Sequence, residues 1–140
     1  MSKGRVLVVD DEPDVRAAVR LILSKAGYDV IEAEDGQAAV TALKPGNNAI
    51  QVDVIICDLD MPKMSGIEAI PNFLFGLPSC PIIILSGSEK LESAARLFQP
   101  GIMFKQGVKE FLSKPIDQVK LLRAVEKVIN ESGRRDQVAT

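Results

Sequence analysis

Short runs of consecutive hydrophobic residues recur along the chain. Three of them are rich in β-branched residues and cover residues 6–9, 52–57 and 82–85, and two weaker ones cover 28–33 and 111–112. A strand with one exposed face alternates apolar and polar residues, whereas a strand covered on both faces is apolar at consecutive positions. The runs therefore predict five strands of a parallel sheet with helices above and below it.

Two helices are marked clearly by their apolar faces and by the residues at their ends. The first begins at Pro13, and Gly27 is suited to end it because glycine readily adopts the left-handed conformation. The last has Asp117 as its N-cap and Gly133 just past its last turn. Their apolar residues recur at helical spacing: Val15, Val19, Ile22 and Ala26 in the first, and Val119, Leu122, Val125 and Ile129 in the last.

Three weaker helical patterns lie in the middle of the chain. They cover residues 37–43, residues 66–76, where Pro71 predicts a kink or a late start, and residues 89–106, where Pro100 predicts a break. Strands and helices that alternate in this way are joined by right-handed crossovers. The predicted fold is an α/β, doubly wound, five-stranded parallel sheet with five flanking helices.

Length and composition are those of one globular domain. The chain has 140 residues, of which 46% are hydrophobic and 26% are charged, and this fits a single core. Residues 1–131 are predicted to form that domain. Residues 132–140 lack apolar periodicity and are predicted to be a tail or the start of a linker to a further domain.

The charge balance and the residue types that are absent exclude several functions. Seventeen Lys and Arg against nineteen Asp and Glu give a net charge of −2, which provides no positive field for binding nucleic acid directly. The chain has no histidine, so imidazole catalysis and histidine metal ligation are excluded. Cys57 and Cys80 lie beside apolar runs, as buried reduced thiols do, which favours a cytoplasmic location. No apolar stretch approaches the roughly 20 residues of a membrane span, so no membrane contact is expected.

Polar residues that follow the predicted strands are the candidates for chemistry, because doubly wound sheets bind ligands outside the carboxyl ends of their strands. They are Asp10, Asp11, Asp58, Ser86 and Lys114. Taken singly, each has an ordinary explanation: a cap of the following helix, which Glu12 could also provide, the start of a turn, or a loop lysine.

Taken together, these residues indicate chemistry on a phosphoryl group. Three carboxylates at one sheet edge repel one another, by about 4 kcal/mol for two unit charges about 4 Å apart at an effective dielectric constant of about 20. A hard divalent cation such as Mg²⁺ relieves that repulsion. The lysine adds a positive charge and the serine a hydroxyl donor around a phosphoryl group. One carboxylate is then the nucleophile and forms an aspartyl phosphate.

Four segments resemble a known family. They are residues 6–13 (VLVVDDEP), residues 54–62 (VIICDLDMP) followed by Gly66, residues 82–87 (IIILSG) and residues 111–115 (FLSKP). In this order they resemble the receiver domain of bacterial two-component response regulators, of the chemotaxis-regulator type, over roughly residues 4–131. The resemblance implies a flavodoxin-like fold with strand order 2-1-3-4-5.

The resemblance also implies roles for the acidic residues and the lysine. Asp58 matches the phosphoacceptor, and Lys114 matches the lysine that pairs with the phosphoryl group. Asp10 and Asp11 match the acidic pair that holds Mg²⁺, and Asp58 and the main-chain carbonyl of Asp60 match the other protein ligands.

Four positions match residues that act after phosphorylation. Ser86 matches the switch hydroxyl that turns to a phosphoryl oxygen, and Phe111 matches the aromatic residue that follows it. Phenylalanine keeps the packing part of this switch but has no hydroxyl. Asp60 and Ser88 match positions that tune the lifetime of the phosphoryl group.

The function implied by the resemblance is a signalling switch. A sensor histidine kinase or a phosphotransfer protein donates a phosphoryl group to Asp58, with Mg²⁺ as cofactor. Phosphorylation then switches the face formed by the fourth helix, the fifth strand and the fifth helix. That face controls an output domain, an effector protein or a phosphorylation-dependent homodimer. Such a chain catalyses its own phosphorylation and dephosphorylation and is not a turnover enzyme.

Two other interpretations stay open. A haloacid-dehalogenase-like phosphatase also has two aspartates after an apolar strand, as Asp58 and Asp60 are here, followed by a serine and a lysine. That family places its second acidic pair after the lysine, whereas Asp10 and Asp11 come first in this chain. A flavodoxin-like interaction module without phosphorylation leaves the acidic cluster unexplained.

Overall fold

The chain folds around one parallel sheet. The computed structural model describes residues 2–35, 38–39, 41, 52–58, 80–87 and 108–139, with side chains as far as residue 131. Its elements are β1 (Arg5–Val9), α1 (Pro13–Lys25), β2 (Asp29–Ala33), β3 (Val54–Asp58), β4 (Ile82–Gly87), β5 (Val108–Lys114) and α6 (Gln118–Ala139). The strand order is β2-β1-β3-β4-β5, and every neighbouring pair is parallel. The predicted sheet and its order are confirmed.

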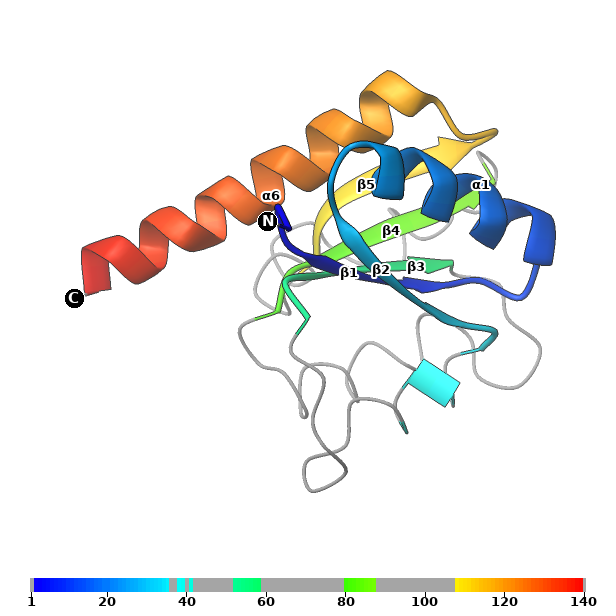
Figure 1. Ribbon diagram of the computed structural model, residues 1–140, viewed down its shortest axis with the longest axis horizontal. Coiled ribbons are helices and arrows are strands. Elements are labelled where there is room, and N and C mark those ends of the chain that lie inside the picture. The colour runs from blue at the N-terminus through cyan, green and yellow to red at the C-terminus, as the bar shows by residue number, and fades with distance from the viewer. Residues whose placement is uncertain are drawn as a thin grey trace.

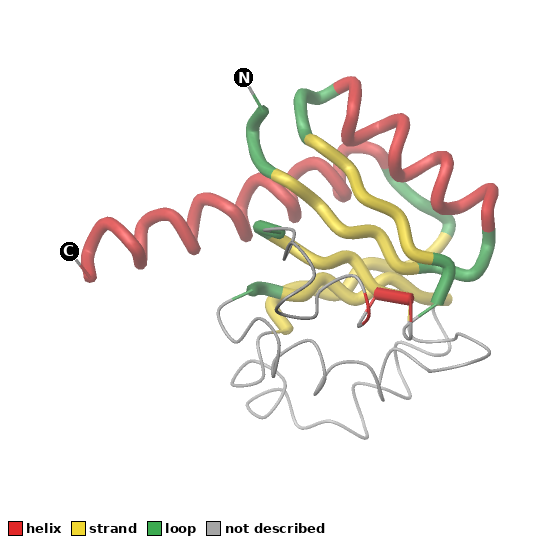
Figure 2. The backbone as a smooth tube through the Cα atoms, turned by 60° about the horizontal axis from the view of Figure 1, so that its bottom comes forward, coloured by secondary structure: helices red, strands yellow, loops and turns green. Residues whose placement is uncertain are grey.

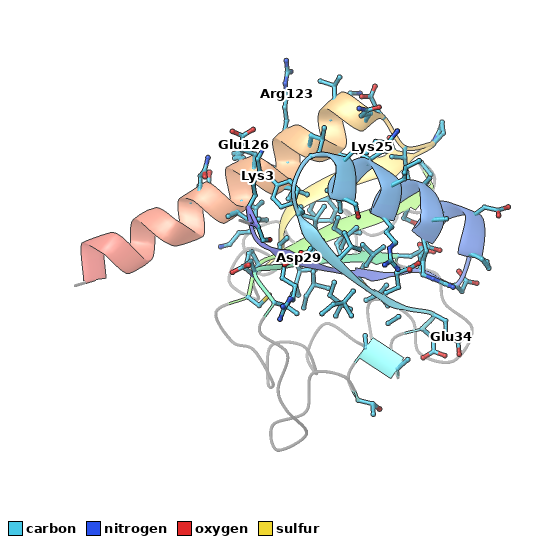
Figure 3. All side chains as sticks on the ribbon, in the orientation of Figure 1. Lys3, Lys25, Asp29, Glu34, Arg123 and Glu126 are labelled. Carbon is cyan, nitrogen blue, oxygen red and sulfur yellow. The ribbon has the colours of Figure 1, made fainter. Side chains whose placement is uncertain are left out.

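Both long helices cover the same face of the sheet (Figures 1 and 2). Alternate side chains of the strands point to this face and pack against the apolar sides of α1 and α6. Figure 3 shows charged side chains such as Lys25 and Arg123 projecting from the outer sides of the same helices. The fully buried members of this core include Val6 and Val8, Val54 and Ile56, Ile83 and Leu85, Val19 and Leu23, and Leu121, Val125 and Val128.

The other face of the sheet is buried as well. Leu7, Ile55, Ile82 and Ile84 alternate along the strands with residues of the first face, and each is 0% exposed. Because both sets of side chains are apolar, the central strands appear in the sequence as uninterrupted hydrophobic runs. The prediction that these strands are covered on both faces is confirmed.

The edge strand β5 is longer than the two residues that predicted it. Lys109, Glu110 and Ser113 interrupt its apolar pattern, and all of its positions except Val108 are at least partly exposed. An edge strand pairs on one side only and tolerates polar side chains. The hydrophobic run at residues 111–112 therefore marked only the middle of the strand.

The ends of α1 are those that the sequence predicted. Pro13 is its first residue, Ala26 is the C-cap, and Gly27 follows with a φ of +101°, in the left-handed region. At the start of α6, the amide of Lys120 donates to Oδ1 of Asp117 at 3.1 Å, so the predicted N-cap is confirmed.

The expected end of the last helix at Gly133 is wrong. The backbone of α6 stays helical through Ala139, and its last turns extend past the edge of the sheet (Figure 1). A glycine inside a helix costs only about 1 kcal/mol relative to alanine, and no proline follows to stop the helix. The domain boundary at residue 131 stays a prediction, but the segment after it is helical rather than irregular.

The middle of the chain is described in part. Residues 38, 39 and 41 are helical, inside the predicted helix 37–43, and the amide of Ala38 donates to Oδ1 of Asp35 at 2.7 Å as at a capped helix start. The predicted helices 66–76 and 89–106 lie outside the described residues, so the count of five helices stays a prediction. Among the described residues, no helix has the length and apolar character needed to cross a membrane.

Candidate functional site

The sheet brings the predicted site residues to one edge. β1 and β3 run in register with Val9 beside Cys57, β3 and β4 with Asp58 beside Leu85, and β4 and β5 with Gly87 beside Lys114. Because the strands are parallel, their carboxyl ends lie together. Asp58 and Lys114 are the last residues of β3 and β5, and Asp10 follows β1 directly.

A single ammonium group contacts three carboxylates at this edge. Nζ of Lys114 lies 3.1 Å from Oδ2 of Asp10 and 3.1 Å from Oδ2 of Asp58. It lies 3.6 Å from Oε1 of Glu12, whose side chain is 60% exposed. The side chains of Asp10 and Asp58 are 1% and 4% exposed, so two of these ion pairs are shielded from solvent.

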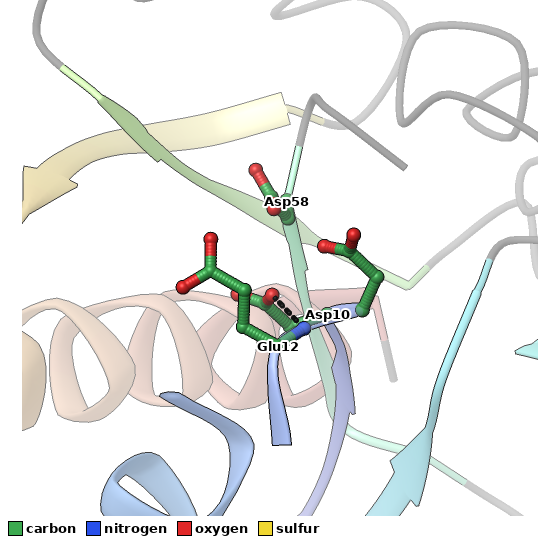
Figure 4. A group of neighbouring side chains, drawn as sticks. Asp10, Glu12 and Asp58 are labelled. Atoms are coloured by element: carbon green, nitrogen blue, oxygen red, sulfur yellow. Dashed lines mark hydrogen bonds between the residues drawn. The ribbon is translucent and has the colours of Figure 1, made fainter. Parts of the chain in front are cut away.

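Four carboxyl groups gather around this contact. Asp10, Asp11, Glu12 and Asp58 each offer an oxygen within 4.8 Å of the others, and Figure 4 shows the labelled side chains side by side at the ends of β1 and β3. One ammonium group cannot balance four carboxylates, so the pocket keeps an excess of negative charge. An all-oxygen donor set of this kind fits a hard cation such as Mg²⁺.

The electrostatics of the pocket show in two pKa shifts. The pKa of Asp58 is raised to about 6, mainly by burial and next by the negative charge of Asp10, although Lys114 acts in the opposite direction. Burial alone lowers the pKa of Lys114, but its contacts with Asp10 and Asp58 outweigh this and raise the pKa. Lys114 is therefore an ammonium group at neutral pH, and the charge of Asp58 is disfavoured by its burial and by the neighbouring Asp10.

Ser86 lies at the same edge with its hydroxyl buried. It follows Leu85, the register partner of Asp58, and is 1% exposed. Its Oγ has no hydrogen-bond partner within the described part of the chain. A buried hydroxyl without a partner costs about 1–3 kcal/mol, so a ligand oxygen would stabilise it. Phe111 is the register partner of Ile84, two residues before Ser86, which places Phe111 and Ser86 on the same face of the sheet.

Two residues do not have the ordinary structural roles that the sequence allows for them, a helix cap for Glu12 and a loop lysine for Lys114. Glu12 occupies the N-cap position of α1 but makes no side-chain capping hydrogen bond, and its carboxylate lies near Lys114 instead. Lys114 is the last residue of β5 and faces three carboxylates, so it is not an ordinary loop lysine.

The structure describes most of the residues predicted for the site. The structure brings together Asp10, Asp11, Asp58 and Lys114 as expected, whereas Asp60 and Ser88 lie outside the described residues. Glu12 is a member of the cluster that was not expected, although its place directly after the acidic pair was a usable signal.

Fold and site together define a doubly wound α/β domain with an acidic pocket at the carboxyl edge of its sheet. The sequence-family model that describes the response regulator receiver domain matches residues 6–126 of this chain. The chain belongs to this family and is a receiver domain of the two-component response regulators.

Individual relatives agree with this assignment. The chain is 34% identical over 125 residues to the chemotaxis protein CheY of Thermotoga maritima, across 89% of this chain and 96% of that protein. It is 32% identical over 129 residues to the transcriptional regulatory protein GlrR of Escherichia coli K12, across 92% of this chain and 27% of GlrR. The crystal structure of NtrX from Brucella abortus aligns with a TM-score of 0.84 and 25% identity, across 99% of this chain and 30% of NtrX. The chain thus spans less than a third of GlrR and of NtrX.

Proposed function

We propose that Asp58 accepts a phosphoryl group from the phosphohistidine of a sensor histidine kinase or a phosphotransfer protein. The observation that carries the proposal is the position of its carboxylate, buried at the end of β3, 3.1 Å from Lys114 and beside Asp10. The chain has no histidine, so the partner must supply the phosphohistidine. In the transfer, an Asp58 oxygen attacks phosphorus, the phosphorus–nitrogen bond breaks, and the electron pair of that bond stays on the imidazole.

The other residues of the pocket receive supporting roles. Lys114 holds and neutralises a phosphoryl oxygen. Asp10, Asp11 and Asp58 hold Mg²⁺, with the main-chain carbonyl of Asp60 as a further ligand. When bound, Mg²⁺ offsets the negative charge of the carboxylates and the phosphoryl oxygens. The excess negative charge of the cluster and its all-oxygen donors support this assignment.

The response to phosphorylation begins at Ser86. Its buried hydroxyl donates to a phosphoryl oxygen, and Phe111 repacks with it and alters the face formed by β5 and α6. Water later attacks phosphorus, the bond to the Asp58 oxygen breaks, and phosphate leaves. Asp60 and Ser88 control access of that water.

The proposal also covers the location, the domain bounds and the output of the switch, as the sequence predicts them. The chain works in the cytoplasm as a switch phosphorylated once per cycle rather than as a turnover enzyme. Residues 1–131 form the receiver, which acts on an output domain, an effector protein or a second copy of itself. Both arrangements occur among the relatives, since the chain covers 27% of GlrR and 96% of the Thermotoga maritima CheY. The receiver itself binds neither nucleic acid nor membrane.

The proposal is tested with a small phosphodonor. The protein is incubated with acetyl phosphate and Mg²⁺, and its intact mass and sedimentation are measured together. One phosphoryl group per chain is expected, lost in Asp58→Asn and in chelator but kept in Asp29→Asn, a control at the exposed start of β2. Sustained phosphate release from p-nitrophenyl phosphate would support the phosphatase alternative instead, and no labelling would favour the interaction module.

A further inference from the structure

Asp10 is held at three atoms by its surroundings. Its amide donates to the carbonyl oxygen of Ala33 at the end of β2, at 3.2 Å, and its own carbonyl oxygen accepts a hydrogen bond from Nη1 of Arg16 at 2.7 Å. Its Oδ1 accepts from the amide of Glu12 at 3.0 Å, the bond drawn in Figure 4. Oδ2 is then the atom that faces Lys114.

The guanidinium of Arg16 is itself anchored. Its Nε lies 3.5 Å from Oε1 of Glu32 on β2, and Arg20, one turn further along α1, places Nη1 2.6 Å from Oε2 of the same carboxylate. The side chains of Arg16 and Glu32 are 18% and 28% exposed, whereas that of Arg20 is 55% exposed. Glu32 on β2 thus anchors Arg16, and the more exposed Arg20 binds the same carboxylate.

We propose that Arg16 is a positioning residue of the phosphorylation site. It holds the main chain of Asp10 so that Oδ2 stays directed at the pocket, while its guanidinium binds the carbonyl oxygen of Asp10 and the carboxylate of Glu32. The proposal rests on the assignment of this pocket to Mg²⁺ and a phosphoryl group made above. Residues behind the direct ligands orient them in metal sites, and losing one typically weakens metal binding about 10–100-fold.

The sign of one measurement separates positioning from simple charge. A cation near the pocket repels Mg²⁺, so if Arg16 acted only through its charge, removing that charge would strengthen Mg²⁺ binding. If Arg16 positions Asp10, removing it loosens a ligand and weakens binding. Arg20→Met is the matched control, because it removes the same charge from the same helix and the same partner without touching Asp10.

The test compares Arg16→Met with Arg20→Met. Calorimetry is expected to show Mg²⁺ binding weakened by about tenfold in Arg16→Met and changed by less than about twofold in Arg20→Met. In chelator, the amides of Asp10 and Glu12 are expected to exchange faster with solvent only in Arg16→Met, since their bonds depend on the position of Asp10. Binding that is unchanged or tighter in Arg16→Met, or equal effects in the two variants, would overturn the proposal.

The exchange measurement keeps the two proposals separable. If the wild type binds no Mg²⁺, the metal assignment fails, but exchange of the Asp10 and Glu12 amides in chelator still decides the role of Arg16. If Arg16→Met does not fold, Glu32→Gln loosens the guanidinium without removing it. Faster exchange of the Asp10 and Glu12 amides in chelator is then expected at smaller size, and its absence would count against Arg16 as the positioning residue. Mg²⁺ binding does not decide in this variant, because removing a negative charge weakens it in either case.

Discussion

Lys114 at the end of β5 reaches Asp58 at the end of β3, across the intervening strand β4, with 3.1 Å between Nζ and Oδ2. Two strand spacings amount to about 10 Å, which an extended lysine and an aspartate span together. The lysine therefore links three strand ends, because the same nitrogen also contacts Asp10 beyond β1. Its ammonium supplies positive charge to the two buried carboxylates of the pocket.

Replacing Lys114 with methionine should have opposite effects on stability and on metal binding. In chelator, the free energy of unfolding should fall by about 3–5 kcal/mol, because Lys114 no longer contacts the buried carboxylates of Asp10 and Asp58. Mg²⁺ should bind more tightly, since it no longer competes with the ammonium, while labelling by acetyl phosphate should slow. Urea unfolding, calorimetry and intact mass measure the three effects. Lys127→Met, at a lysine that is 61% exposed and pairs with Glu110, is the control. Equal loss of stability in both variants would contradict the argument.

Replacing Asp58 with asparagine should stabilise the protein in chelator at neutral pH. The change removes one negative charge from a cluster of four carboxyl groups and keeps the shape of the side chain. Thermal unfolding should show a higher Tm for Asp58→Asn than for the wild type, whereas Asp29→Asn, an exposed control, should leave it unchanged. An equal or lower Tm for Asp58→Asn would show that the repulsion is relieved by other means.

The advantage of Asp58→Asn should disappear at acidic pH. The pKa of Asp58 is raised to about 6 in the folded protein, from a usual value near 4, so the folded state binds its proton more strongly than the unfolded state. The stability that this proton provides is present below the usual pKa and is lost as the pH rises through about 6. Urea unfolding in chelator across this range should show wild type and variant converging below about pH 4, separating as the pH rises from about 4 to about 6, and keeping a constant difference above that. If the difference in free energy of unfolding between wild type and variant does not change with pH, titration of Asp58 is excluded as its source.

The central sheet was predictable because the burial of its strands shows directly in their residue types. β1, β3 and β4 are covered on both faces, so consecutive positions along most of each strand are apolar and the runs stand out in the sequence. The end of α6 was not predictable, because glycine weakens a helix without forbidding it. The edge strand β5 was seen only in its middle, since exposed positions place little demand on residue type.

The site was predictable where it is made of motif residues and not where it depends on side-chain direction. Asp10, Asp58 and Lys114 each follow or end a strand, and parallel strands bring them together whatever the rest of the chain does. Glu12 could face the helix as a cap or the pocket as a carboxylate, and its residue type fits both. Arg16 contacts a main-chain oxygen, which the identity of Asp10 does not reveal.

Gly27 should not tolerate a side chain, for reasons of backbone conformation rather than space. Its φ is +101°, whereas the nearest atoms to an added Cβ would be those of the Lys3 side chain, at an ordinary 3.5 Å. Gly27→Ala should therefore lower the free energy of unfolding by about 1–3 kcal/mol, the usual cost of such a conformation. Gly87→Ala is the control, because its φ lies outside the positive range and its Cβ would meet nothing within 4 Å. Urea unfolding measures both variants. Similar losses would mean that the left-handed turn after α1 is not the source of strain.

Mg²⁺ should stabilise the wild-type protein in proportion to how strongly the pocket binds it. A ligand that binds only the folded state raises the free energy of unfolding with the logarithm of its concentration once the site is filled, by about 1.4 kcal/mol for each tenfold increase. The Tm of the wild type should therefore rise through millimolar Mg²⁺, and that of Asp58→Asn should rise less, because one carboxylate of the cluster is gone. Potassium chloride at matched ionic strength controls for screening of the charges. A Tm that follows ionic strength alone would mean that the carboxylates repel one another without forming a metal site.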